Sequence, residues 1–285
     1  MFVIVGYIFM CACIFGSFSI HGKLVALWQP LEIVIILGGA IGAMIVGYGG
    51  NPLKATLKAL PTLFKGTAYS KAFYMDLFAL LYELLQKVRK EGLMSIEGDV
   101  EDPHASPLFS KYPKVSHDHH VVEFLTDYLR LMVGGNLNAF EIENLMDVEI
   151  ETHHHEAEFP AQAIAKVADG LPAFGIVAAV MGVVNTMGSL HLPPSELGPM
   201  VGAALVGTFL GILMAYGFVG PLATILERKV GEGTQVFNTI KVTLLASLNG
   251  YAPQVAVEFG RKALNSTERP SFKELEDFVK NAKNK

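Results

Sequence analysis

Long apolar segments alternate with polar segments along the chain, and four of the apolar segments carry almost no charge. They cover residues 1–20, 31–48, 171–190 and 197–225. A helix needs about 20 apolar residues to cross the hydrocarbon core of a membrane, so each segment is predicted to be a transmembrane helix. The first segment lacks a basic start and a clear small-residue cleavage site, which favours a retained helix over a cleaved signal peptide.

The polar segments also show helical periodicity. Residues 71–91 and 121–133 have apolar side chains at helical spacing. A third helix is predicted to begin near Asn138 and to continue past Pro160 toward the third apolar segment, and the tail after residue 225 is periodic in the same way. No segment of useful length shows the alternation typical of strands, so the fold is predicted to be all-helical.

Lysine and arginine are unevenly distributed about the four predicted spans. The loops 21–30 and 191–196 hold one and none, whereas eleven lie between spans two and three and ten follow span four. Basic residues favour the cytoplasmic side, so both termini and the long middle segment are predicted to be cytoplasmic.

The predicted fold class is therefore an all-α integral membrane protein with four transmembrane helices and a large cytoplasmic helical domain. That domain would combine the loop between helices 2 and 3 with the C-terminal tail. The predicted segments are 1–48 with two helices and a short periplasmic loop, 49–168 as the cytoplasmic loop, 169–225 with the last two helices, and 226–285 as the tail.

Spans three and four carry small residues along one face. The positions that share a face are Gly175, Ala178, Ala179, Gly182 and Thr186 in span three, and Ala204, Thr208, Gly211 and Ala215 in span four. Such faces pack helices closely within one chain, or they line a narrow pathway or grip a helix of another subunit. Neither span has an ionisable residue at mid-depth, and Glu32 and Asp169 lie only at span ends. Ion pathways normally need such a group, so a partner helix would have to supply it, while Thr186 and Thr208 can offer hydroxyl oxygens.

Two prolines mark the cytoplasmic ends of these spans. Pro172 suits the first turn of a helix that begins at Leu171. Pro221 lies in a pattern that is helical on both sides, so it is predicted to leave a carbonyl unpaired near Gly217 and to bend the helix. The bend is either a static kink or a place where events in the membrane are converted into cytoplasmic motion.

No catalytic, metal or nucleotide site is predicted. The histidine clusters at 117–120 and 153–156 lack a strong ligand spacing, and Cys11 and Cys13 point to different sides of one helix. The glycine-rich stretch at 38–50 lies largely in a membrane span, and the net charge of −5 argues against a nucleic-acid partner. The chain is therefore expected not to be an enzyme and to bind no cofactor.

Charged residues gather where the helix at 71–91 ends. Lys87, Arg89 and Lys90 lie in its last turn, and acidic residues follow from Glu97 to Asp102. This is either a solvated face or a docking surface for a charged partner, which complementary charges would steer into rapid contact.

With these residues in view, the sequence resembles the MotA family, the larger stator subunits of the bacterial flagellar motor. The resemblance covers nearly the whole chain. It is carried by LPAFGIVAAVMGVV at 171–184, VGTFLGILMAYGFVGPLAT at 206–224, FEIENLMDVEIETH at 140–153 and NGYAPQVAVEFGRKAL at 249–264.

The resemblance implies a torque-generating stator subunit of the bacterial inner membrane. Five such subunits would surround two MotB helices, and MotB would supply the membrane aspartate that binds the coupling ion. Pro172 and Pro221 match prolines tied to coupling ion flow to movement. Arg89 and Glu97 match residues that engage the rotor protein FliG, and Thr208 matches a threonine of the ion pathway.

Ala179 stands where sodium-driven relatives carry a threonine, which removes an oxygen ligand that a hard cation needs. The coupling ion is therefore expected to be the proton. The alternative is an energiser of the ExbB or TolQ type, but such proteins have three membrane helices, so residues 31–48 favour the stator. A membrane metallo-enzyme that uses the histidine clusters is the alternative from another class.

Overall fold

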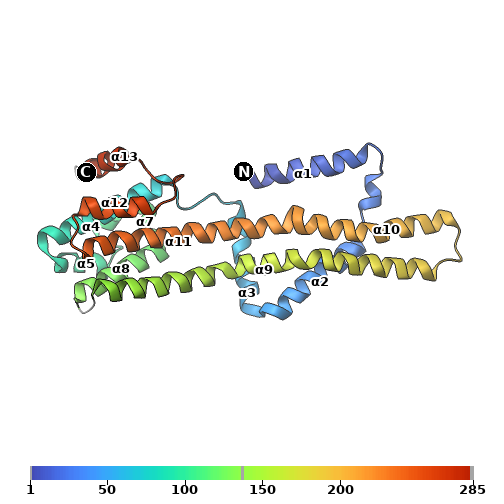
Figure 1. Ribbon diagram of the computed structural model, residues 1–285, viewed down its shortest axis with the longest axis horizontal. Coiled ribbons are helices and arrows are strands. Elements are labelled where there is room, and N and C mark those ends of the chain that lie inside the picture. Colours follow the sequence, from blue (N-terminus) through green and yellow to red (C-terminus); the bar gives the residue numbers. More distant parts are fainter. Residues whose placement is uncertain (1, 136–137, 283–285) are drawn as a thin grey trace. The chain divides into compact units, whose positions relative to one another are not determined.

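The computed structural model describes residues 2–135 and 138–282, and every regular element in these ranges is a helix (Figure 1). The all-helical prediction is thus confirmed for this part of the chain. The chain divides into two compact units. Unit 1 comprises Met1–Gly66 with Ala157–Arg228, and unit 2 comprises Thr67–Glu156 with Lys229–Lys285.

Unit 1 begins with the apolar helices of the N-terminal part. Its elements are α1 (Phe2–Ser19), η1 (Leu24–Leu27), α2 (Pro30–Tyr48), α3 (Gly50–Ala59) and η2 (Leu60–Phe64). The later part of α9 (Ala139–Gly188), α10 (Pro194–Ile212), the π-helical segment η4 (Leu213–Val219) and the start of α11 (Gly220–Leu248) complete it. The α2 helix packs against α10, and α1 packs against η4.

Three helices in the described chain are long and apolar enough to cross a membrane. They lie within Leu24–Tyr48, Ala139–Gly188 and Pro194–Leu248, and Val3–Ser19 is a shorter apolar helix. Many large apolar side chains of unit 1 are exposed, such as Val46 and Leu31 of α2 and Val184 of α9. Exposed apolar surface on this scale is typical of a protein that contacts lipid or other subunits.

The continuous helix expected from near Asn138 into the third apolar segment is confirmed, so the alternative that a new helix begins at Leu171 is wrong. Pro160 and Pro172 both lie inside the continuous helix α9. A proline inside a helix leaves the carbonyl four residues earlier without its usual donor, and here the helix continues past it. Pro172 is therefore an interior residue of α9 and not its first turn.

Pro221 is the second residue of α11 and directly follows the π-helical segment η4. The Gly220 amide donates to the carbonyl of Ala215, five residues back, as π-helical geometry requires. The helical pattern expected on both sides of Pro221 is confirmed. The widened turn before the proline accommodates its missing amide hydrogen, because neighbouring amides shift to other carbonyls.

Unit 2 is built around α4 (Lys71–Glu91), whose ten buried side chains form the centre of its core. The other elements are η3 (Leu93–Ile96), α5 (Glu97–Glu101), α6 (Pro107–Ser110), α7 (Pro113–Ser116), α8 (His119–Gly134), α12 (Pro253–Ala263) and α13 (Phe272–Ala282), with the earlier part of α9 and the later part of α11. Ser70 caps α4, Asp118 caps α8, and Gly92 ends α4 with a φ of 87°. The helix predicted at 71–91 matches α4.

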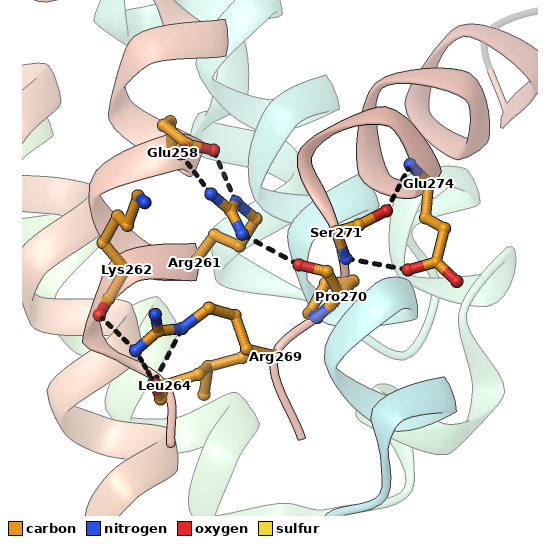
Figure 2. Close-up of polar contacts among 8 residues, drawn as sticks. All are labelled: Glu258, Arg261, Lys262, Leu264, Arg269, Pro270, Ser271 and Glu274. Atoms are coloured by element: carbon orange, nitrogen blue, oxygen red, sulfur yellow. Dashed lines mark hydrogen bonds and ion pairs between the residues drawn. The ribbon is translucent and has the colours of Figure 1, made fainter. Parts of the chain in front are cut away.

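Two arginines hold the last segment of unit 2 (Figure 2). The buried Arg261 of α12 binds Glu258 through Nε, at 2.6 Å, and its Nη1 donates to the Pro270 carbonyl at 2.8 Å. Arg269 Nε donates to the carbonyl of Leu264 at 3.0 Å. The Ser271 and Glu274 side chains then cap the start of α13 reciprocally, so the path from α12 to α13 is fixed by polar contacts.

Candidate functional site

Helices α9 and α10 of unit 1 lie side by side (Figure 1). They meet through glycine residues. A Cβ atom added at Gly175 would lie 3.0 Å from both the carbonyl oxygen of Gly207 and the Cα of Gly211. One added at Gly211 would lie 2.7 Å from the carbonyl oxygen of Leu171. Small residues allow membrane helices to approach until their backbones touch, and no larger side chain fits here without moving a backbone.

The same contact continues toward the loop between the two helices. A Cβ atom added at Gly182 would lie 3.0 Å from the Cα of Ala204, and Ala178 and Ala204 are buried. Thr186 is buried too, and its hydroxyl donates to the Gly182 carbonyl at 2.9 Å. Of the two alternatives for the small-residue faces, packing within one chain is therefore confirmed for these residues.

Ala179 and Thr208 lie beside this contact and are half-buried. The Ala179 amide nitrogen is 3.2 Å from a Cβ atom added at Gly207, the residue next to Thr208. Ala179 and Thr208, two of the three expected pathway residues, therefore lie at the same height along the α9–α10 helix pair. Thr186 lies seven residues beyond Ala179 in α9, which corresponds to about 10 Å along a helix.

The face of α9 that does not meet α10 is lined with large apolar side chains. Those more than 40% exposed are Ile176, Val177, Val180, Met181, Val183, Val184 and Met187. Inside a membrane such a face is covered by lipid or by helices of other chains. The small-residue face is thus occupied within the chain, and the surface left for other subunits is the large-residue face.

Two polar side chains of unit 1 make contacts that the sequence did not predict. The Tyr7 hydroxyl of α1 donates to the Phe218 carbonyl of η4 at 2.8 Å, and the two rings stack with their centroids 5.4 Å apart. Glu32 of α2 points at Gly207, with its Oε2 atom 3.4 Å from a Cβ added there. The signal that could have found them is that each is a polar side chain in or at the end of an otherwise apolar segment.

The charged patch at the end of α4 contains two kinds of residue. Lys87 Nζ binds Asp99 Oδ2 at 2.8 Å, and the Ser106 hydroxyl donates to Asp99 Oδ1 at 2.6 Å. The Asp99 side chain is only 8% exposed. These three residues hold α4, α5 and α6 together, so Lys87 and Asp99 are structural members of the patch.

Arg89 and Glu97, in contrast, are exposed. Within the described residues neither makes an ion pair or a side-chain hydrogen bond. Arg89 lies in the last turn of α4 and Glu97 opens α5, and the short helix η3 between them packs against α4. The structure therefore leaves the two expected rotor-contact charges available to a partner.

Two known protein families match parts of this chain. Residues 4–92 match the motility protein A N-terminal family, and residues 117–239 match the MotA/TolQ/ExbB proton channel family. The chain is 54% identical to Motility protein A of Escherichia coli strain K12, over 100% of this chain and 97% of that protein. It belongs to the motility protein A family. The chemotaxis protein LafT of Vibrio parahaemolyticus is 36% identical over 96% of each chain.

Solved structures of the motility protein A family share the fold. The structure of the flagellar MotAB stator complex from Bacillus subtilis matches with a TM-score of 0.74 and 25% identity, over 96% of this chain and 98% of that chain. The structure of C. jejuni MotAB matches with a TM-score of 0.77 and 19% identity, over 94% and 97%. The family match and the apolar helices together identify a membrane protein whose relatives are stator and channel proteins and not enzymes.

The histidine clusters of this family member lie in unit 2. One ligand atom each of His119, His120 and Glu123 lies within 4.8 Å of the others, and all three residues are exposed. The rings of His120 and His153 are 5.5 Å apart. Burial, and then the neighbouring His120, lower the pKa of His153 below its usual value. The expectation that no metal binds here stays a prediction.

Proposed function

We propose that this chain works in a flagellar stator complex that conducts protons and turns the rotor. The observation that carries the proposal is the 54% identity to a motility protein A over the full length, joined to the fold of the MotAB stator. The chain is a flagellar stator subunit, and its partner in the complex is a MotB protein. This role implies a membrane topology, a coupling ion, an ion pathway and a contact with the rotor.

The proposed topology has four membrane helices: α1, α2, the later part of α9, and α10 continued through η4. Both termini and unit 2 would face the cytoplasm, and the complex would lie in the bacterial inner membrane. The distribution of lysine and arginine supports this orientation, because the loops at 21–30 and 191–196 are nearly free of them. The apolar helix α1 would be retained as the first span.

The proposed ion pathway runs beside Ala179, Thr186 and Thr208. A MotB aspartate would supply the carboxyl that binds the ion, and the Thr208 hydroxyl would face it. Ala179 has no oxygen to offer a sodium ion, so the proton is the proposed coupling ion. Thr186 would form part of the wall of the pathway, and its burial and its hydrogen bond to the Gly182 carbonyl support this passive role.

Five copies of the chain are proposed to surround two MotB helices. The uncovered apolar face of α9 supports this assembly, because a single chain leaves it exposed. Pro172 and Pro221 would carry the motion from the membrane helices to unit 2. The π-helical turn before Pro221 supports such a role, since it is a local departure from regular hydrogen bonding at which a helix can bend.

Arg89 and Glu97 are proposed to contact oppositely charged groups of FliG. Their support is that both are exposed and unpaired within the described residues, while their neighbours Lys87 and Asp99 bind each other. An ExbB or TolQ energiser is the competing function, since the second matched family includes those proteins. The match of residues 4–92 to the motility protein A N-terminal family favours the stator.

The proposal is tested by producing this chain with its MotB partner in bacteria that lack both stator subunits. We expect swimming whose speed follows the proton-motive force and does not change when sodium is replaced by potassium. Arg89→Glu combined with Glu97→Lys should abolish swimming while the chain stays at its normal level in the membrane. The matched control is Lys273→Glu with Asp277→Lys, another pair of exposed charges in unit 2, which should swim normally.

Three results would each contradict a part of the proposal. If a wild-type complex assembles but the cells do not swim, the proposed stator function itself is contradicted. Normal swimming of the Arg89 and Glu97 double variant would contradict only the proposed rotor contact. A steep dependence of swimming speed on sodium would contradict only the proposal that the coupling ion is the proton.

A further inference from the structure

We propose that Glu32 of α2 is a proton-carrying carboxyl of this chain, placed at mid-depth of the membrane next to the ion pathway. The inference rests on the proposed function, because it adds a residue to that pathway. Its starting point is that Glu32 Oε2 is buried and, among the side chains of the described residues, is the one buried polar atom without a hydrogen-bond partner.

The contacts of Glu32 place its carboxyl against the α9–α10 pair. A Cβ atom added at Gly207 would lie 3.4 Å from Glu32 Oε2, 3.3 Å from Ala178 Cβ and 3.2 Å from the Ala179 amide nitrogen. One point of α10 is therefore in contact with the glutamate and with α9 at once. Gly207 precedes Thr208 in α10, so the carboxyl lies within one residue of the proposed pathway on both helices.

The depth of this point follows from helix geometry. Gly207 is thirteen residues after Pro194, where α10 begins, and Ala178 is ten residues before Gly188, where α9 ends. At 1.5 Å per residue these intervals are about 20 Å and about 15 Å. The hydrocarbon core is about 30 Å thick. The carboxyl thus lies near its middle, although Glu32 is in the first turn of its own helix.

The chain before α2 explains this depth. The short helix η1 packs against α10, and Leu27 at its end packs against the buried cluster of unit 1. Val25 of η1 is 82% exposed. The segment between α1 and α2 therefore follows the side of α10 into the membrane, and α2 begins well below the outer ends of α9 and α10.

No opposite charge lies at this level in the elements packed against α2. Around Ala178 and Gly207, the helices α9, α10 and η1 hold no charged residue, and the polar residue next to Gly207 is the uncharged Thr208. The nearest charged residues in the chain along each element are Asp169 in α9, Glu196 in α10, Lys23 before η1 and Lys54 in α3. An unpaired carboxylate in hydrocarbon is costly, so the resting group is the neutral carboxylic acid, and an ionisable residue retained at such a cost is expected to have a function.

The proposed step is a proton transfer. From its resting acid form, Glu32 gives one proton to the carboxylate of the partner helix, which becomes the acid, and Glu32 becomes the carboxylate. The Glu32 carboxylate then takes one proton from the outer aqueous phase, through water that enters from that side, and returns to the acid. Each cycle moves one proton and leaves Glu32 unchanged.

The test uses the full chain in complex with its MotB partner, reconstituted in lipid vesicles. Infrared difference spectra between acid and alkaline buffer report carboxyl groups that gain a proton. We expect a carboxyl band that disappears in Glu32→Gln and persists in Glu196→Gln, the same substitution at an exposed residue at the start of α10. In swimming cells, Glu32→Gln should shift the pH of half-maximal speed by roughly one unit, and Glu32→Asp should restore part of the shift.

The outcomes separate this inference from the proposed function. Wild-type swimming together with an unchanged spectrum and pH profile in Glu32→Gln would overturn the inference alone. Failure of the wild-type complex to swim would overturn the proposed function, while the spectra would still decide whether Glu32 gains and loses a proton. If Glu32→Gln does not accumulate in the membrane, Glu32→Asp decides: its shorter side chain should alter the pH profile, and a wild-type profile would refute the proposal.

Discussion

The α9–α10 contact of unit 1 and the core of unit 2 are two different ways of packing helices. At the first, glycine and alanine bring backbones together, and a Cβ atom added at Gly211 would lie 2.9 Å from the Cα of Gly175. At the second, α4 buries ten side chains, nine of them large, such as Phe78 and Leu81. Water drives the second by the hydrophobic effect, whereas lipid gives helices no such drive and leaves close packing to hold them.

This difference decides where each unit tolerates change. In unit 1 the sensitive positions are those where adding atoms is impossible, and the apolar exposed face of α9 is free to meet other chains. In unit 2 the sensitive positions are those where removing atoms leaves a cavity, and the exposed charges Arg89 and Glu97 are free to meet a partner. The functional surfaces are therefore the uncovered parts of both units, and the packed parts hold them in place.

The largest expected effect comes from adding one methyl group to the α9–α10 contact. Gly211→Ala puts a Cβ atom 2.7 Å from the Leu171 carbonyl oxygen, so the two backbones must separate. We expect loss of swimming and loss of co-purification with MotB. Gly202→Ala is the matched control in α10, because nothing lies within 4 Å of a Cβ atom there. Equal behaviour of the two variants would show that unit 1 does not depend on close backbone packing.

A smaller effect is expected from removing atoms in unit 2. Leu81→Ala takes a fully buried side chain from the core, which should cost about 2–5 kcal/mol of stability. Thermal unfolding of the full chain in detergent should show the loss as a lower transition temperature of unit 2. Leu145→Ala, the same change at a side chain that is 45% exposed, is the control. If both variants melted alike, the core of unit 2 would not be the structure's main source of stability.

Local patterns predicted the helices well, because periodicity and caps act within a few turns. The helix expected at 71–91 coincides with α4, since its apolar spacing ends where Gly92 takes a positive φ. The helix expected to run from near Asn138 into the third apolar segment is confirmed, whereas the alternative that Pro172 opens a new helix is wrong, because a proline alone does not reveal that the helix continues on both sides of it. The π-helical turn before Pro221 left no sequence signal beyond the proline itself.

The candidate site was predicted in its residues but not in its contacts. The small-residue face of span three is visible in the sequence, yet its occupant depends on which helix lies against it, and that is α10 of the same chain. Glu32 was placed at a span end by counting along α2. The depth of Glu32 in the membrane depends instead on where α2 begins beside α10. This position is set by tertiary contacts, which the sequence of α2 alone does not reveal. The roles of Arg89, Glu97 and Thr208 stay predictions.

The smallest expected effect tests whether unit 2 also depends on the protonation of its surface. His153 of α9 is near His120, and burial together with that neighbour lowers its pKa below the usual 6.5, against the opposing effect of Glu156 and Glu149. The unfolded chain therefore binds a proton at a higher pH than the folded chain does, so stability falls as the pH drops through 6.5 toward the lowered pKa, and the loss is complete below it.

We expect the melting temperature of the full chain to fall between about pH 7.5 and pH 5.5, a range chosen to bracket the ordinary histidine pKa, and to fall less in His153→Gln. His155→Gln, an exposed histidine two residues along α9, is the control and should retain the wild-type pH dependence. A His153→Gln chain with the wild-type slope would mean that the ring is not held neutral by the fold.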